Sequence, residues 1–561
     1  MVFMLVAPLF STTPVHAEAH PASVSPVVSA AGFTHPGVFV SLDELRTTKA
    51  HVLAGDKPWV DDFRQLKSSP YAQRGAPTFK EFASAHAADP QHSTCSEDDP
   101  AGCVTLCGSY NNPDVGCSAE QDDARAVYGQ ALLYWYTGDT TYAKRAVAIL
   151  NAYAHHFKGN TGSNGPLMTA WTAEQMIRGA ELLRYTYRPS PRSTVFDVHA
   201  FSAMLRKVFV PTLTSFDYGT VHGNWQFSAA DGLMNIAVFL DDRALYDHAI
   251  TMWRKRVMSY IYLSTDGVLP IPPPNYSGQD GTPATLSCLW LDNKTHACET
   301  DPKTDPHLTF QNGQSEETCR DFLHTSMGLS GIVNTAETAW IQGLDLYGEQ
   351  QRRILTGVLY TIQIAQEQDT QGMPAGFCSG VKIRAGRNSL DELAADVVFN
   401  AYAVRKGVTL SAIDIPGYAT PSQHDDPLAR FIAQSRANDG HVGNLVAWDS
   451  LTHHLASAPV SGADGGAASP TPGSTGETSA PDDTPSSTPP GIADSPTTAP
   501  HPPPFGFSGP SFALGVGFGL FIATALVILG VALRRRESRG CAGADASTRR
   551  PRPPGRRREP R

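Results

Sequence analysis

The sequence has little of the two-residue alternation between apolar and polar side chains that marks a half-buried β-strand. This alternation is scarce between about residues 32 and 455, so the sequence predicts a domain with a low β content. A zinc finger is also disfavoured, because no His or Cys pair follows Cys103 and Cys107 at the spacing that a finger needs.

Charge and large apolar side chains are missing from particular stretches of the chain. Residues 1–17 contain an apolar run without Lys or Arg and end on a small-x-small pattern, so they resemble a secretory signal peptide. Residues 459–510 consist almost entirely of Pro, Ser, Thr, Gly, Ala and Asp. Such a composition cannot bury a core, which predicts a disordered, solvated linker.

Residues 512–533 are an uncharged run of 22 residues, which is long enough to predict one transmembrane helix. The tail that follows, residues 534–561, holds eleven Arg against three carboxylates. Because basic residues collect on the cytoplasmic side, we expect a single-pass protein of the cell membrane with its N-terminal domain outside. The tail is expected to contact anionic lipid rather than nucleic acid. It carries about +8 of the overall −10, so the residues before it hold near −18.

The cysteines agree with an oxidising compartment. Eight of the nine precede the predicted membrane helix, and Cys541 alone lies in the tail. An even number outside the membrane predicts as many as four disulfides, whose pairing the sequence leaves open. The eight are Cys95, Cys103, Cys107, Cys117, Cys288, Cys298, Cys319 and Cys378.

Between residues 32 and 455 the apolar residues recur at helical spacing, with short turns between successive helices. The turn and helix around Asp139 and Tyr142 resemble those around Asp242 and Tyr246, and Asp345 with Tyr347 is a looser third instance. Repeated helical hairpins indicate an array, so we predict an all-α domain, an (α/α) toroid. The predicted helices are 122–136, 142–157, 166–187, 196–216, 223–239, 244–262 and 316–347.

The last of these predicted helices carries Arg320 and His324 four residues apart, and therefore on one face. A fixed cation beside an imidazole is suited to holding a carboxylate while a proton is moved nearby. Taken alone, the pair also fits an ordinary helix with a surface Arg and a buried His.

Polar and aromatic residues stand where other helices are expected to begin. Asn224 would be a helix cap or a hydrogen-bond donor to a substrate carboxylate, and Trp225 offers a flat face to a sugar ring. Polar residues at successive hairpin entrances would line one rim of a helical barrel, where a polymer could lie. The further candidates for binding are His222, Asn164, Trp171 and Gln121.

Four separated motifs, in order along the chain, resemble the alginate lyase family of polysaccharide lyases, and the similarity runs through most of residues 32–368. The motifs are EQDDARAVYGQALLYWYTGD, SNGPLMTAW, HGNWQFS…IAVFLDDRALYDHAITMWRKRV and ETCRDFLHT…AETAWIQGLDLY. The resemblance implies an (α/α) toroid that cleaves a uronic acid polymer by β-elimination without a metal or other cofactor. The partner it implies is an acidic polysaccharide.

The resemblance also implies roles at three positions. Asn224 would neutralise the substrate carboxylate, Arg320 would clamp it or act structurally, and His324 would be the base or the partner of the base. Related lyases often place a Tyr after this His, whereas Thr325 stands here. A Tyr proton donor would therefore come from elsewhere, and the sequence offers Tyr260, Tyr262 and Tyr276.

Two other functions stay open at this stage. An inverting glycoside hydrolase on the same fold needs an acid and a base carboxylate across the cleft, and no spacing identifies the pair. A non-catalytic carbohydrate-binding or adhesion protein would suit the acidic domain, because net negative charge repels a polyanion. The carboxylates available to a hydrolase are Asp122, Asp123, Asp231, Glu316 and Glu317.

Overall fold

A computed structural model describes residues 24–455 except for residues 192, 217–221, 275–282, 292–308, 375–376, 381–388, 420–425 and 438–441. Residues 1–17, 459–510, 512–533 and 534–561 lie outside the described part, so the predicted signal peptide, linker, membrane helix and tail stay predictions. Among the helices that are described, none combines the length and the apolar character needed to cross a bilayer.

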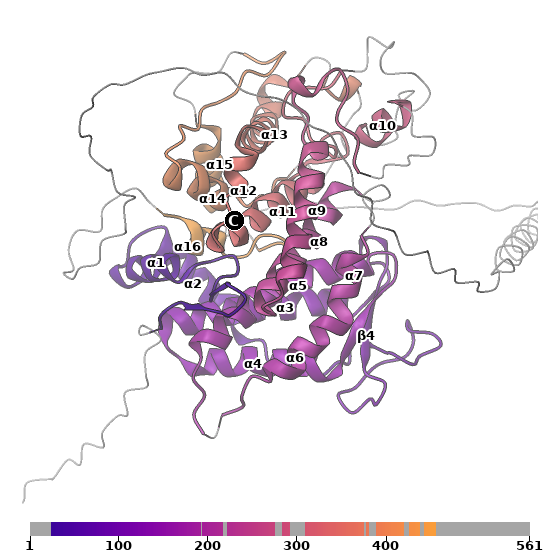
Figure 1. The fold of residues 1–561 in the computed structure, drawn as a ribbon, viewed down its shortest axis with the longest axis vertical. Helices are drawn as coiled ribbons and strands as arrows, with labels where there is room; N and C mark the ends of the chain where they lie inside the picture. The colour runs from indigo at the N-terminus through magenta and orange to yellow at the C-terminus, as the bar shows by residue number, and fades with distance from the viewer. Residues whose placement is uncertain are drawn as a thin grey trace, which may run out of the picture. The chain divides into compact units, whose positions relative to one another are not determined.

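The described domain is rich in helices, as predicted, with a few short strands (Figure 1). Its helices are α1 Leu42–Ala54, α2 Trp59–Ser68, α3 Cys117–Thr137, α4 Thr140–His156, α5 Gly165–Thr186, α6 Val198–Met204, α7 Val210–Thr214, α8 Gly223–Phe239, α9 Arg243–Tyr260, α10 Pro283–Trp290, α11 Phe322–Ile341, α12 Leu346–Glu349, α13 Gln351–Gln371, α14 Ala395–Phe399, α15 Pro427–Ala437 and α16 Asp449–His453. The strands are β1 Val27–Val28, β2 Thr34–His35, β3 Ala83–Ser84, β4 Cys103–Cys107, β5 Asp114–Val115 and β6 Phe157–Thr161.

The inner helices contact one another in chain order. α3 packs against α5, α5 against α8, and α8 against α11. α11 contacts α14, α14 contacts α16, α16 contacts α2, and α2 contacts α3, so the order of contacts returns to its start. α4, α6, α7 and α9 pack outside this ring, as Figure 1 shows for α4, α6 and α7 around α3, α5 and α8. A cyclic order of this kind is what a toroid requires.

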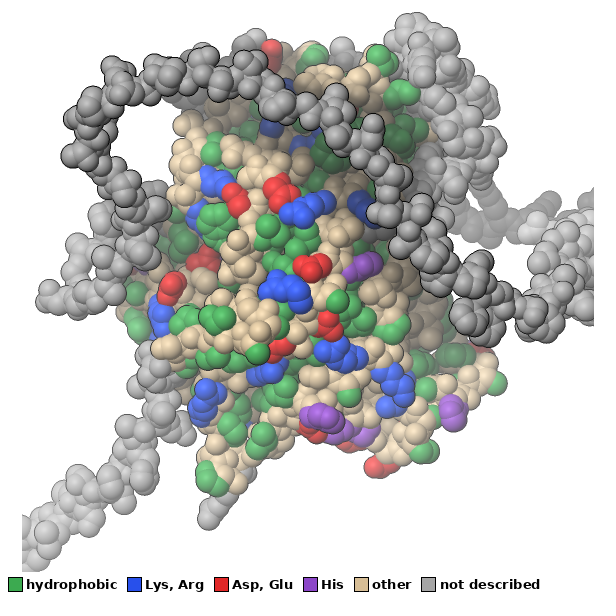
Figure 2. All heavy atoms as spheres, viewed as in Figure 1, with side chains coloured by type: hydrophobic (Ala, Val, Ile, Leu, Met, Phe, Trp, Pro, Cys, Tyr) green, Lys and Arg blue, Asp and Glu red, His purple; other side chains and the backbone are tan. Residues whose placement is uncertain are grey.

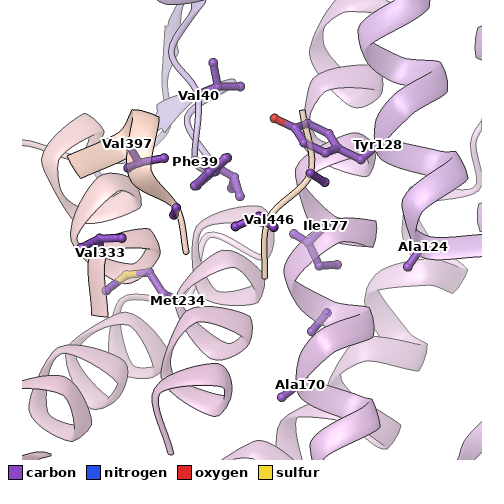
Figure 3. Close-up of a cluster of buried hydrophobic side chains, with 14 of the residues drawn as sticks. Phe39, Val40, Ala124, Tyr128, Ala170, Ile177, Met234, Val333, Val397 and Val446 are labelled. Carbon is purple, nitrogen blue, oxygen red and sulfur yellow. The ribbon is translucent and has the colours of Figure 1, made fainter. Parts of the chain in front are cut away.

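Apolar side chains fill the space that the inner helices enclose (Figure 3). Tyr128 of α3, Ile177 of α5 and Val333 of α11 converge there with Phe39 and Val446 from connecting segments. All five side chains are buried. The two connecting segments therefore complete the core that the helices alone would leave open.

The repeated Asp turns seen in the sequence are helix caps. The side chain of Asp139 accepts a hydrogen bond from Thr141 N (2.8 Å) at the start of α4. Asp242 does the same for α9, and Asp345 for α12. An aspartate cap satisfies a backbone N–H that the first helical turn leaves unpaired, which explains why the motif recurs.

The sequence did not predict a small four-stranded sheet. β4 pairs antiparallel with β3 and β5 and parallel with β6. Disulfides join Cys95 to Cys103 and Cys107 to Cys117 at the two ends of β4, and another joins Cys319 to Cys378. The predicted disulfides are confirmed for these cysteines. A zinc site at Cys103 and Cys107 is wrong, because the two belong to different disulfides.

Charged side chains of both signs are interspersed over the face shown in Figure 2. Charged pairs at the surface of the domain include Arg206 with Asp242 and Arg254 with Glu349. Pairs as exposed as these contribute little to stability. The net negative charge of the domain therefore does not determine the potential at any particular hollow of the surface.

Candidate active site

A cavity of about 630 Å³ lies where α3, α5, α8 and α11 begin. Six of the eight predicted site residues lie together at these helix starts. The sequence had predicted that polar residues at successive hairpin entrances would line one rim. The six are Gln121, Asn164, Trp171, Trp225, Arg320 and His324. Helix starts carry partial positive charge, so this place favours an anionic ligand.

His324 is held by the residue that caps its own helix. Asp321 Oδ1 lies 2.6 Å from His324 Nδ1 and accepts a second hydrogen bond from His324 N (2.8 Å). Burial acts to raise the pKa of Asp321, but the hydrogen bonds with His324 and the charge of Arg320 hold it below its usual value. Asp321 is fully buried, whereas the His324 side chain keeps an 11% exposed edge at the cavity.

Arg320 reaches the cavity from a turn rather than from a helix. The predicted helix 316–347 is wrong at both ends, because α11 begins at Phe322 and ends at Ile341. The Asp321 cap sets this start, since its side chain satisfies the first turn. Arg320 Nη1 donates to Glu317 Oε1 (3.0 Å), which fixes the guanidinium beside His324.

Asn224 and His222 do not line the cavity. Asn224 is buried, and its N and Nδ2 donate to the carboxylate of Glu317 at 3.0 and 2.5 Å. Its side chain does not cap α8, because carboxylates from another segment take that place: Glu316 accepts from Gly223 N (3.2 Å). The sequence predicted that Asn224 would face a substrate carboxylate. In the structure Asn224 lies outside the cavity lining, and its side-chain amide donates to Glu317 instead.

A buried network of charges lies behind the cavity wall. Arg256 donates to Glu316 and to Gln226, and Glu316 also lies 3.3 Å from His222 Nδ1. Burial acts to raise the pKa of Glu316, but Arg256 and His222 hold it below its usual value. Burial acts to lower the pKa of His222, while its hydrogen bond to Glu316 raises it above the ordinary value.

The two predicted Tyr proton donors that the structure describes lie outside the cavity lining. Tyr260 is fully buried and donates to Glu317 (3.1 Å), and burial raises its pKa well above its usual value. Tyr262 donates to Gly267 O (2.6 Å), outside the cavity lining, and Tyr276 lies outside the described residues. Tyr110, which the sequence did not indicate, lines the cavity and is 63% exposed.

The wall that contains Tyr110 is built by loops at the ends of β4 and β6. Asn164 N donates to Cys107 O (2.8 Å), and Asn164 Nδ2 donates to Asn111 Oδ1 (3.2 Å). Ser109 Oγ lies 3.1 Å from Ser163 Oγ. Tyr110 and Asn111 both have positive φ, a conformation that sequence patterns do not reveal.

Residues missed by sequence reasoning complete the opposite wall. Arg125 Nη2 and Gln121 Nε2 both donate to Asn444 Oδ1, at 3.2 and 3.0 Å. Asn444 is placed by Glu392, which accepts from its backbone N at 2.8 Å. Nothing near Asn444 in the sequence suggested this position. The lining residues not predicted are Ser109, Tyr110, Asn111, Arg125, Ser163, Leu167, Leu323, Met327 and Asn444.

Among the described residues, the lining holds two Arg and one His but no carboxylate. The carboxylates proposed above for hydrolysis lie outside it: Asp123 binds Arg74 and Tyr153, and Asp231 binds Arg178. Beneath the aromatic wall, the indole N–H of Trp171 is buried without a hydrogen-bond partner among the described residues. The cavity can therefore offer the guanidinium groups of Arg125 and Arg320 and the imidazole of His324 to an anionic ligand.

Comparison with known proteins agrees with the resemblance seen in the sequence. Residues 83–271 match the family model described as alginate lyase. This segment includes Tyr110, Gln121, Trp171 and Trp225 of the cavity but ends before Arg320. A search of curated proteins finds no match.

Solved structures similar to this chain include three of alginate lyases. Alginate lyase A1-III from Sphingomonas species A1 is 13% identical, with 71% of this chain and 99% of that chain covered and a TM-score of 0.40. An alginate lyase from Bacteroides ovatus is 14% identical, with 75% and 100% covered and a TM-score of 0.42. A variant of A1-III complexed with a tetrasaccharide is 13% identical, with 72% and 98% covered and a TM-score of 0.42. Residues 83–271 of this chain are thus similar to the alginate lyase family, which supports an enzyme of the polysaccharide lyase class.

Proposed function

We propose that this protein cleaves a uronic-acid-containing, alginate-like polysaccharide by β-elimination, in a cavity at one mouth of an (α/α) toroid. One observation carries the proposal: the cavity lining combines Arg125, Arg320 and His324 with aromatic side chains, and none of the described residues that line it is a carboxylate. A uronate polymer carries one negative charge on each ring, so a cationic cavity without carboxylates attracts it even though the whole chain is acidic.

The first requirement of the reaction is neutralisation of the uronate carboxylate. The C5 proton is too weakly acidic to remove until this charge is compensated and the enolate-like intermediate is stabilised. The guanidinium of Arg320 stands beside His324, and Arg125 lines the same cavity. Trp171 and Trp225 offer apolar faces for the sugar rings. In this scheme the Arg side chains do what the sequence assigned to Asn224, whose amide is occupied by Glu317.

The second requirement is a base for the C5 proton. His324 Nε2 would form a bond to this proton as the C5–H bond breaks. The released electron pair forms the C4=C5 double bond, and the bond between C4 and the bridging oxygen breaks. The departing oxygen takes a proton from the Tyr110 hydroxyl or from water. Tyr110 is proposed for this step because it is the one Tyr among the described residues that line the cavity.

Hydrolysis fits the cavity less well. An inverting hydrolase needs one carboxyl group to protonate the leaving oxygen and a second to activate water. Neither is present among the residues that line the cavity. The five candidate carboxylates do not line it, and Asp123, Asp231, Glu316 and Glu317 are buried in ion pairs and hydrogen bonds.

The cell surface is the proposed place of action. The support comes from the sequence, where a signal-like start, a Pro- and Ser-rich linker, the apolar run 512–533 and a basic tail follow the expected order. The disulfides of the described domain suit an oxidising compartment. We propose that the chain contacts the membrane through one C-terminal helix and does not bind nucleic acid.

The test compares wild-type protein with His324→Gln on a panel of alginates, pectates and glycosaminoglycans. Ultraviolet absorbance of the new double bond measures turnover, and calorimetry measures polymer binding. We expect the wild type to form unsaturated products from at least one polymer, and the variant to bind that polymer without turnover. Binding without turnover by the wild type would instead indicate an adhesion protein. Reducing ends that form without unsaturation would indicate a hydrolase.

A further inference from the structure

Asp321 is joined to His324 by two hydrogen bonds that end on one oxygen. Asp321 Oδ1 accepts from the backbone N of His324 (2.8 Å) and lies 2.6 Å from His324 Nδ1. The carboxyl group is fully buried, and its second oxygen has no hydrogen-bond partner among the described residues. One short side chain therefore caps α11 and also binds the imidazole.

An ionised carboxylate only accepts hydrogen bonds, so the imidazole nitrogen facing it must carry a proton. In neutral His324 this leaves the lone pair on Nε2, the nitrogen that Asp321 does not bind. Because His324 lines the cavity with its exposed edge, the basic nitrogen is available to a ligand there. The choice of tautomer determines which ring nitrogen of His324 can accept a proton.

The charged groups around this pair have partners of their own. Glu317 binds Arg320, Asn224 and Tyr260, and Glu316 binds Arg256 and His222. Burial acts to raise the pKa of Asp321, but the hydrogen bonds and charge of His324, and after them the charge of Arg320, hold it below its ordinary value. Asp321 is accordingly the group that sets the state of the imidazole.

We propose that Asp321 is a positioning residue that holds His324 as a base, with the proton on Nδ1 and the lone pair on Nε2 directed to the cavity. The proposal rests on the proposed function, in which His324 takes the C5 proton. When Nε2 takes that proton, His324 becomes an imidazolium with two N–H groups. The Asp321 carboxylate then stabilises this cation, and no proton moves to Asp321.

The kinetic test uses Asp321→Asn and Asp321→Ser, because Asn and Ser cap helices nearly as well as Asp and the start of α11 should survive. We expect kcat to fall by about 10²–10⁴-fold in both variants, with KM changed by less than about fivefold. The matched control is Asp242→Asn, which alters the cap of α9 outside the cavity and should leave kcat unchanged.

The second measurement needs no substrate. Nitrogen-15 NMR of the His324 imidazole reports which nitrogen is protonated. We expect a single Nδ1–H tautomer in the neutral wild-type side chain and a mixture in Asp321→Asn. An Nε2–H tautomer in the wild type, or an unchanged tautomer and kcat in both variants, would overturn the proposal. If the wild type shows the Nδ1–H tautomer but cleaves no uronate polymer, the proposed function fails while the positioning by Asp321 stands.

Discussion

The residues that line the cavity and those directly behind them differ in how their charges are compensated. The described lining holds Arg125, Arg320 and His324 without a carboxylate, whereas the carboxylates that bind these side chains lie behind or beside it. Behind the wall, Arg256 and Glu316 are fully buried and paired with each other. The arrangement leaves positive charge facing the cavity, with the partners of Arg320 and His324 buried in the protein and Asp122, the partner of Arg125, at the surface outside the lining.

Substitutions in the lining and substitutions behind it should therefore affect different properties, activity in the first case and stability in the second. A side chain of the lining is partly exposed, so its replacement should cost activity and little stability. A member of the buried network leaves an uncompensated charge when its partner is removed, so its replacement should cost stability. The lining is the place of the chemistry, and the layer behind it positions the lining.

The largest expected effect is on turnover by His324→Gln. Loss of the base should lower kcat by about 10²–10⁴-fold, whereas the free energy of unfolding should change by less than about 1 kcal/mol. The rate of unsaturated product and chemical denaturation of the same preparations measure the two quantities. Asn224→Ala, behind the wall, is the comparison: it should lose stability through Glu317. A variant at position 324 that keeps more than a tenth of kcat would remove His324 from the chemistry.

The next effect is on stability and follows from Arg256→Met. Glu316 would be left buried without its cation, so the free energy of unfolding should fall by about 3–5 kcal/mol. Denaturant titration measures it. Arg206→Met is the matched control, because Arg206 is half exposed in its pair with Asp242 and should cost less than about 1 kcal/mol. Equal losses from the two substitutions would contradict the distinction between buried and exposed pairs.

Substrate capture should change when either cavity Arg is neutralised. Arg320→Gln and Arg125→Gln each remove a charge-assisted contact of about 1.5–3 kcal/mol, so kcat/KM should fall about 10–100-fold. Both variants should also lose part of the dependence of kcat/KM on ionic strength, which steady-state kinetics over a range of salt measures. Arg64→Gln, which removes a remote and exposed cation, should do neither. An unchanged salt dependence would show that these cations do not steer the polymer.

The smallest expected effect is on the pH dependence of stability. Burial of Glu120 raises its pKa to about 8, above its ordinary value of 4.5. Between these values the folded protein binds a proton that the unfolded chain releases, so stability falls as pH rises through this range. Glu120→Gln should remove about 1–3 kcal/mol of that fall between about pH 5 and pH 8. Denaturation of both proteins at the two pH values tests this, and parallel curves would contradict it.

The sequence predicted the features that have a period or a short motif. The helices α3, α4, α5, α8 and α9 appear close to the predicted places because their apolar spacing is regular, whereas the predicted helix 196–216 divides into α6, a π-helical segment and α7. The Asp turns recur because each one caps a helix. Helix starts can also be predicted from local sequence. Gln121, Asn164 and Trp225 stand at or near such starts, and they lie together in the cavity lining.

The rest depended on contacts between distant segments. Asn444 binds Gln121 across 323 positions of sequence, so no local signal could place it in the cavity. Asn224 had a convincing local motif, but Glu317 from another segment takes its amide. Arg320 precedes α11 because Asp321 caps that helix. Helical periodicity does not indicate at which residue the helix begins, so the sequence placed Arg320 inside it. Tyr110 is presented by a loop with positive φ between Cys107 and Cys117, for which the sequence shows no pattern.

The ratio of unsaturated ends to new reducing ends tests the central claim most directly. It is measured on one purified uronate polymer after partial digestion by the wild-type protein. β-Elimination in the cavity predicts one unsaturated ring for each new reducing end, and neither product from His324→Gln at the same polymer saturation. New reducing ends without unsaturated rings, or equal product from the variant, would contradict the account.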